Sequence, residues 1–299
     1  MQINRTECEF MKKRIITGVL AALVAISLLV LIGLGHIKYI SIIAAIFSAI
    51  AAYEILRVSK CKNKVLTGLS CAVAAYVPFH IAFDIGKFIP LSTGNLITIL
   101  VIVMLLVMLK WYDKTRFEHV TLALFGSIAI PSSIMTIYKV DELCSSYPEL
   151  FQRSQMVFIL LCSMYAAWIS DTFAYFVGSK FGKHKLAPKI SPKKSVEGAI
   201  GGVLGNVLVS AITFVICDFA FFGNDTIKIW MVIPASAIIC VIGMCGDLSA
   251  SVIKRNFGEK DFGNLFPGHG GVLDRIDSFL FAMPATYVML SIILAFYKG

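Results

Sequence analysis

The sequence predicts an all-α, polytopic integral membrane protein with about nine transmembrane helices. Of its 299 residues, 58% are apolar and only 15% are charged, which is more apolar surface than a soluble domain of this length buries in one core. A helix needs roughly 20 predominantly apolar residues to cross the hydrocarbon of a bilayer. Such stretches recur along the chain at residues 15–35, 39–57, 65–83, 93–110, 121–138, 156–177, 199–222, 229–249 and 276–297.

The character of these stretches argues against a β-barrel. Leu20 to Leu34 and Leu96 to Leu109 are nearly continuous apolar runs, whereas a membrane strand alternates apolar and polar residues over about ten positions. The sequence shows no convincing internal repeat and no low-complexity linker. We therefore expect one continuous membrane domain, with five mostly apolar helices in residues 1–155 and four helices with interspersed polar residues in residues 156–299.

The net charge of +9 does not indicate nucleic-acid binding, because the basic residues occupy short loops between apolar helices. Assigning the loops alternately to two sides gives 21 of the 27 Lys and Arg residues to one side and six to the other. Cytoplasmic loops carry such an excess. We therefore expect a multi-pass protein of the cell membrane, with the N-terminus and the loops 178–198 and 250–275 in the cytoplasm and the C-terminus outside.

Ionisable residues inside the predicted spans mark candidate functional positions. Asp171, Tyr175 and Gly178 share one helical face because they are four and three residues apart. An aspartate inside a spanning helix costs a few kcal/mol, so Asp171 is expected either to line a polar cavity or to pair with a Lys or Arg of a neighbouring helix. The main polar residues of the N-terminal half are Tyr53, Glu54 and Arg57, at the end of the second stretch.

The loop after residue 178 is rich in lysine and leads directly into the next helix. Lysine ammonium groups and the N–H groups at a helix start both bind phosphates, which makes the loop a candidate site for substrate phosphates. An ordinary cytoplasmic loop that contacts anionic lipid would carry the same charge, but Ser191, Ser195 and Glu197 favour a built site. The lysines are Lys180, Lys183, Lys185, Lys189, Lys193 and Lys194.

The densest group of polar residues lies between Asp247 and Asp277. Asp247, Ser251 and Lys254 or Arg255 lie on one helical face. Carboxylates at helix ends, beside basic residues and a glycine-rich turn, are the groups that hold Mg²⁺ and nucleotide phosphates. Each residue alone could be an exposed ion pair or a turn, but the whole set indicates a functional site. The set continues with Lys260, Asp261, His269, Gly270, Gly271, Asp274, Arg275 and Asp277.

These residues resemble the signature of the phosphatidate cytidylyltransferase, or CDP-diacylglycerol synthase, family. The resemblance runs without a break across the 27 residues from Ser251 to Asp277. Ser195 departs from the family, which usually carries Thr at this position, but the hydroxyl group is kept. By motif the resemblance covers about residues 165–280, whereas the first five helices match only in character. The upstream motifs are Asp171-x-x-Ala174-Tyr175-x-x-Gly178 and Ser191-Pro192-Lys193-Lys194-x-x-Glu197-Gly198.

The resemblance implies transfer of CMP from CTP to phosphatidic acid, giving CDP-diacylglycerol and pyrophosphate, at a cytoplasm-facing cavity of the catalytic helices in residues 156–299. It implies Mg²⁺ near Asp247 and Asp274, the two carboxylates that the residue pattern also indicates. Lys254, Arg255, Lys260 and Arg275 would neutralise phosphates, while Asp171, Asp261, Asp277 and His269 are assigned more loosely to the metal or the pyrophosphate. The residues expected at substrate phosphates are Ser191, Lys193, Lys194, Ser195, Glu197, Ser251, Gly270, Gly271, Asp171 and Tyr175.

Two other functions stay open at this point. A CTP-dependent kinase of a polyprenol or phytol-type lipid would also use CTP in a membrane, but it would transfer the γ-phosphate. An ion-coupled transporter would use Asp171 and Asp247 as a relay, although the inverted repeats typical of such proteins are not visible in the sequence. The sequence also leaves open whether a second cation binds and whether the chain forms a homodimer in the bilayer.

Overall fold

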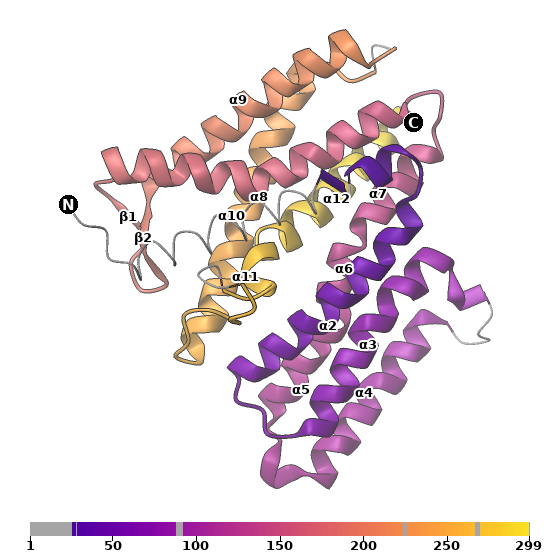
Figure 1. The fold of residues 1–299 in the computed structure, drawn as a ribbon, viewed down its shortest axis with the longest axis vertical. Helices are drawn as coiled ribbons and strands as arrows, with labels where there is room; N and C mark the ends of the chain where they lie inside the picture. The colour runs from indigo at the N-terminus through magenta and orange to yellow at the C-terminus, as the bar shows by residue number, and fades with distance from the viewer. Residues whose placement is uncertain (1–25, 28, 88–91, 224–225, 267–269, 299) are drawn as a thin grey trace, which may run out of the picture. The chain divides into compact units, whose positions relative to one another are not determined.

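The computed structural model describes residues 26–27, 29–87, 92–223, 226–266 and 270–298. Apart from one short hairpin, these residues form helices and their connections (Figure 1). The chain divides into two compact units. The first contains the described residues up to Met135 together with Phe257–Arg275, and the second contains Thr136–Asn256 together with the described residues from Ile276 onward. Most of the signature segment therefore packs with the N-terminal helices.

Eight helical segments of the described residues are long and apolar enough to span a membrane. They match the stretches predicted from residue 39 onward, so the polytopic all-α fold is confirmed. The stretch predicted at 15–35 falls mostly outside the described residues, and the count of nine stays a prediction. The eight segments are Ile37–Val58, Lys64–Phe83, Thr93–Lys110, Phe117–Ser145, Arg153–Phe181, Val196–Ala220, Ile229–Asn256 and Leu273–Phe296.

Small residues and a side-chain cap shape the first unit. The Asn63 carboxamide oxygen accepts the N–H groups of Val65 and Leu66 at 3.0 and 3.2 Å, which starts α3. A Cβ on Gly126 would lie 3.1 Å from the Ala52 Cα, so this glycine lets the π-helical turn η4 approach α2. The elements are η1 (Ile37–Tyr39), α2 (Ile40–Val58), α3 (Lys64–Phe83), η2 (Ile85–Lys87), α4 (Thr93–Lys110), η3 (Tyr112–Lys114), α5 (Phe117–Leu124), η4 (Phe125–Ala129) and α6 (Ile130–Ile134).

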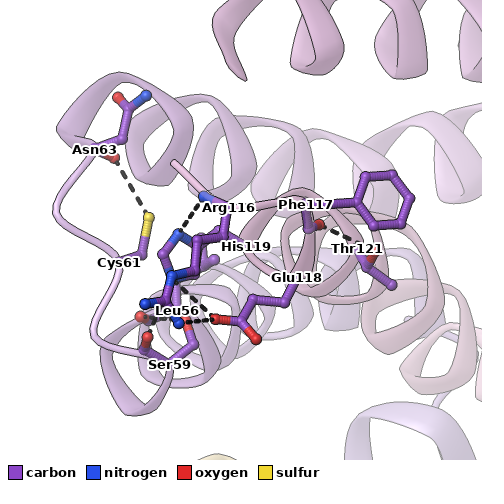
Figure 2. Close-up of polar contacts among 9 residues, drawn as sticks. All are labelled: Leu56, Ser59, Cys61, Asn63, Arg116, Phe117, Glu118, His119 and Thr121. Atoms are coloured by element: carbon purple, nitrogen blue, oxygen red, sulfur yellow. Dashed lines mark hydrogen bonds and ion pairs between the residues drawn. The ribbon is translucent and has the colours of Figure 1, made fainter. Parts of the chain in front are cut away.

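Two loops at one end of the first unit are joined by a buried histidine. Figure 2 shows the His119 ring between the backbones of Arg116 and Ser59. Its Nδ1 accepts the Arg116 N–H at 3.1 Å, so Nε2 carries the proton and donates to the Ser59 carbonyl at 3.2 Å. The Asn63 amide adds a 2.8 Å hydrogen bond to the Thr115 hydroxyl. The connection between α2 and α3 is thus fixed to the start of α5.

The second unit is built around the long helices α8, α9, α10 and α12. Its core contains two clusters of buried apolar residues between these helices. One face of α9 carries Ile200, Leu204 and Leu208, which are 55 to 64% exposed, and an exposed apolar face of a spanning helix is suited to lipid. The elements are α7 (Thr136–Ser145), α8 (Arg153–Phe181), β1 (Lys185–Ala187), β2 (Ser191–Ser195), α9 (Val196–Ala220), α10 (Ile229–Asn256) and α12 (Phe279–Lys298); the short α11 (Leu273–Ile276) lies at the boundary of the units.

The lysine-rich connection between α8 and α9 is a β-hairpin, where the sequence analysis expected a loop. β1 and β2 pair antiparallel, with Lys185 opposite Ser195 and Ala187 opposite Ser191. Strand pairs this short are not visible in a charged sequence, because alternation of apolar and polar residues is missing. The hairpin holds the basic side chains of this connection on a defined backbone.

Candidate active site

Three charged residues from three elements of the second unit come together. The ammonium group of Lys194, on β2, contacts the Asp247 carboxylate of α10 and lies 4.0 Å from the carboxylate of Asp171 on α8. The Asp247 side chain is 17% exposed, the Lys194 side chain 30% and the Asp171 side chain 58%. Asp171 and Asp247 are ionisable residues of membrane-spanning helices, which makes them candidates for a functional role. Asp171 thus lies near a lysine of the hairpin, whereas the sequence led us to expect a polar cavity or a basic residue of a neighbouring helix.

Glu197 and Ser195 shape the hairpin that presents Lys194. The Glu197 carboxylate accepts the backbone N–H groups of Lys183 at 3.1 Å and of His184 at 3.2 Å, and it lies 2.7 Å from the His184 ring nitrogen Nδ1. The Ser195 hydroxyl accepts the Gly198 N–H at 3.1 Å and caps α9. Both residues were expected at substrate phosphates. In the structure their observed contacts are with the hairpin and the helix start.

A close crossing of α8 and α9 fixes the base of the hairpin. A Cβ on Gly198 would lie 2.8 Å from the Ala174 carbonyl oxygen and 3.2 Å from the Gly178 Cα. The two helices can therefore approach this closely only with glycine at position 198. The crossing places Lys194, four residues before Gly198, beside α8 and so explains its contact with Asp171.

The cytoplasmic end predicted for α10 carries the next residues of the signature. Ser251 and Lys254 are buried, with 8% and 7% exposure, and Arg255 is exposed. The Arg255 guanidinium donates through Nε to the Ile190 carbonyl at 3.3 Å, which ties α10 to the hairpin turn. At the start of α12, the Asp277 carboxylate accepts the N–H of Ser278 at 2.7 Å. These residues and Asp247 belong to one unit.

The remaining signature residues belong to the first unit. The Asp274 carboxylate oxygen Oδ2 accepts the N–H groups of Phe262 at 2.7 Å, Gly271 at 2.9 Å and Gly263 at 3.4 Å. Asp274 is buried, with 7% exposure. This carboxylate joins the backbone at Phe262 and Gly263 to the backbone at Gly271, a role that its place in the sequence did not predict. Lys260, Asp261 and Arg275 are exposed, and Gly270 adopts a φ of +80°.

Two predicted residues remain to be placed. His269 lies outside the described residues, so its prediction stands without a structural account. Tyr175 is 71% exposed, and its ring contacts the Phe176 ring edge-on with 5.7 Å between centroids. In the described part of the chain, no contact of Tyr175 with Lys194 or the aspartates is observed.

The donor set of the second unit fits Mg²⁺. This ion is bound in proteins by one or two carboxylates, and substrate phosphates and water complete its octahedron. Asp247 and Asp171 supply two carboxylates around one position that the Lys194 ammonium now neutralises. Among the described residues, no group of three or more His, Cys, Asp or Glu side chains is suited to hold a metal ion. The pairing of Asp247 with Asp274 at one metal stays a prediction, because these carboxylates belong to different units.

Sequence comparisons place these features in a family. The sequence profile of the Cytidylyltransferase family matches residues 12–293. The chain belongs to this family. The resemblance drawn from the motifs is therefore confirmed, and it extends to the helices of the first unit, which the motifs did not cover.

Relatives of the family match the chain over nearly its whole length. A phosphatidate cytidylyltransferase of Bacillus subtilis is 32% identical over 285 residues, which cover 94% of this chain and 98% of that protein. The enzyme of the same name from Staphylococcus aureus is 32% identical over 286 residues, covering 94% and 99%. The one from Staphylococcus saprophyticus is 30% identical over 283 residues, again covering 94% and 99%.

Proposed function

We propose that the chain is a phosphatidate cytidylyltransferase of phospholipid biosynthesis, which makes CDP-diacylglycerol and pyrophosphate from CTP and phosphatidic acid. The observation that carries the proposal is the nearly full-length match to relatives that bear this name. The group formed by Asp171, Lys194 and Asp247 supports it, because a reaction between two anions needs cations and carboxylates at one place.

In the proposed reaction, an ionised phosphate oxygen of phosphatidic acid attacks the α-phosphorus of CTP. A new P–O bond forms while the bond between the α-phosphorus and the oxygen bridging to the β-phosphorus breaks, and pyrophosphate leaves with the electron pair. The attacking oxygen is already ionised at neutral pH, so the residues need not remove a proton. The chain contributes orientation of the two anions and neutralisation of their charge.

Lys194 is the cation that we assign to the substrate phosphates in the second unit. Its ammonium is held by Asp247 and faces Asp171, so binding of a phosphate requires it to exchange one anionic partner for another. Lys254 and Arg255 follow Asp247 on α10, and we assign them to the substrate phosphates as well. For Lys260 and Arg275 the assignment to phosphates comes from the signature alone. Mg²⁺, when bound by Asp247, supplies electrostatic stabilisation of the triphosphate.

We further propose that the site faces the cytoplasm, with the N-terminus inside and the C-terminus outside. The distribution of 21 basic residues on one side and six on the other supports this orientation. A reporter fused after Gly299 is expected to give an external signal in cells. An internal signal would contradict the proposed orientation.

The test of the reaction is a comparison of two labelled forms of CTP. Purified protein in detergent is incubated with phosphatidic acid, Mg²⁺ and CTP labelled at either the α- or the γ-phosphate. Label from the α-phosphate in the lipid product supports cytidylyl transfer. Label from the γ-phosphate would instead show a lipid kinase, and no labelled lipid from either form would refute both reactions.

Two matched pairs of variants test the site. Asp247→Asn is expected to lower turnover at least about a hundredfold, on the order of 3 kcal/mol in the barrier, whereas Asp218→Asn changes an exposed aspartate of the same unit and should have little effect. Lys194→Ala should lower kcat/KM for CTP more than Lys193→Ala, because Lys193 is exposed and only Lys194 is observed at Asp247 in the described structure. Equal effects within either pair would contradict the assignment.

A further inference from the structure

A buried carboxylate of α2 reaches the signature segment within the first unit. Glu54 is only 3% exposed, and its two oxygens accept two successive backbone N–H groups. Oε1 accepts from Val272 at 3.0 Å and Oε2 from Leu273 at 2.9 Å. Such charge-assisted bonds are stronger than bonds between neutral groups. The sequence signal was present, since a glutamate at the end of an apolar span is costly unless it is used.

Arg57, one turn further along α2, holds the other end of the same segment. Its guanidinium donates through Nη2 to the Phe262 carbonyl at 3.0 Å. The Phe262 side chain is completely buried and anchors this end. Asp274 joins the two ends, because its carboxylate accepts the N–H groups of both Phe262 and Gly271. The loop between Phe262 and Leu273 is therefore fastened to α2 at Phe262 and at Val272 and Leu273.

The glycines of the loop fit the Glu54 side chain. A Cβ on Gly271 would lie 2.5 Å from the Glu54 oxygen Oε2, and a Cβ on Gly263 would lie 2.7 Å from its carboxyl carbon. Both positions would collide with the carboxylate, so the backbone can reach Glu54 only with glycine there. The glycine-rich character of the loop thus depends on a residue more than 200 positions earlier in the chain.

We propose that Glu54 is a positioning residue for cytidylyl transfer, which acts by holding the loop that precedes Asp274 and Arg275. This inference rests on the proposed function. Glu54 touches the backbone of the loop, and its effect on the reaction passes through the side chains that the loop presents. A displacement of such side chains by about 1 Å costs on the order of a hundredfold in rate.

The informative change is Glu54→Gln, which keeps the shape of the side chain. The glutamine amide would point an N–H donor at the N–H of Val272 or Leu273, so one bond is lost and the donors repel. Glu118→Gln is the matched control, because it removes a carboxylate from an exposed position of the same unit. Arg57→Gln is a second variant at an exposed position, where folding is expected to survive, and it removes the bond to Phe262.

The experiment measures kcat, KM and loop protection in the full-length protein. Glu54→Gln should lower kcat per folded molecule about 10- to 100-fold with little change in KM for CTP, and Arg57→Gln should lower it less. Trypsin cleavage after Lys260, two residues before the loop, relative to cleavage after the exposed Lys114 of the same unit, should become faster in both variants. The ratio of the two cleavage rates reports on the loop, because a general loss of folding would speed cleavage at both sites.

Three results would overturn the inference. The first is a kcat of Glu54→Gln equal to that of Glu118→Gln. The second is a loss of activity that disappears when rates are expressed per folded molecule, and the third is an unchanged ratio of the two cleavage rates. If the wild-type protein forms no CDP-diacylglycerol, the proposed function itself fails, and the cleavage ratio still shows separately whether Glu54 holds the loop.

Discussion

Replacement of Gly198 by alanine tests whether the crossing of α8 and α9 organises the candidate site. The added Cβ would lie 2.8 Å from the Ala174 carbonyl oxygen and 2.9 Å from the Ser195 hydroxyl oxygen. Ordinary contacts of a Cβ begin near 3.4 Å, so the backbones must separate by about 0.6 Å, the difference between 3.4 and 2.8 Å. The carbonyl oxygen belongs to a helical backbone and cannot move aside alone.

The magnitude follows from two opposing effects. Overpacking of a close contact costs about 1 to 3 kcal/mol, whereas alanine is favoured over glycine inside a helix by up to about 1 kcal/mol. Taking the middle of each range, we expect Gly198→Ala to destabilise the protein by about 1.5 kcal/mol. Gly68→Ala is the matched control, because Gly68 lies in α3 with no atom within 4 Å of an added Cβ. For Gly68→Ala, only the preference for alanine over glycine inside a helix applies.

The assay compares thermal unfolding in detergent and CDP-diacylglycerol synthesis for the two variants. Gly198→Ala should unfold at a lower temperature than the wild type and lose activity, since Ser195 and the hairpin with Lys194 move with α9. Gly68→Ala should unfold at the same or a higher temperature with unchanged activity. If both variants behave alike, the close crossing does not determine the geometry of the hairpin and the reasoning is refuted.

Two further changes test contacts within each unit. Asn63→Ala removes the cap of α3 and the bond to Thr115, and should lower the free energy of unfolding by about 1 to 2 kcal/mol; an unchanged value in chemical unfolding would contradict the cap. Arg153→Leu leaves Asp141, whose side chain is 11% exposed, without its ion pair. The double change with Asp141→Asn should unfold at a higher temperature than Arg153→Leu alone, because an unpaired buried charge costs more than a lost pair. An unfolding temperature of the double variant below that of Arg153→Leu would show that the unpaired Asp141 carboxylate costs little in the folded protein.

The membrane helices could be predicted because their signal is local. Each span needs only about 20 apolar residues in a row, and the eight observed segments correspond to the predicted stretches, although Phe117–Ser145 and Ile229–Asn256 continue past the predicted ends at 138 and 249. The face shared by Asp247 and Ser251 was predictable for the same reason, since helical spacing places residues four apart together. The sequence thus contained the helices and the polar faces that they present.

The partners of the charged residues could not be predicted in this way. Lys194 meets Asp171 and Asp247 only because a hairpin and a glycine crossing place it there. Glu54 binds backbone N–H groups more than 200 residues away. Backbone donors carry no residue-specific signal in a sequence, so a carboxylate that serves them looks the same as one that binds a metal or a substrate.

This difference changes how the glycine-rich segment is expected to act on phosphates. Glycine-rich loops beside helix starts often bind phosphates through their backbone N–H groups, and the family resemblance places Gly270 and Gly271 at substrate phosphates. In the structure, several N–H groups of the segment are already bound by the carboxylates of Glu54 and Asp274. We therefore propose that phosphate contacts in this part of the chain come from the exposed cationic side chains that flank the segment, Lys260 and Arg275. The bound donors are those of Phe262, Gly263, Gly271, Val272 and Leu273.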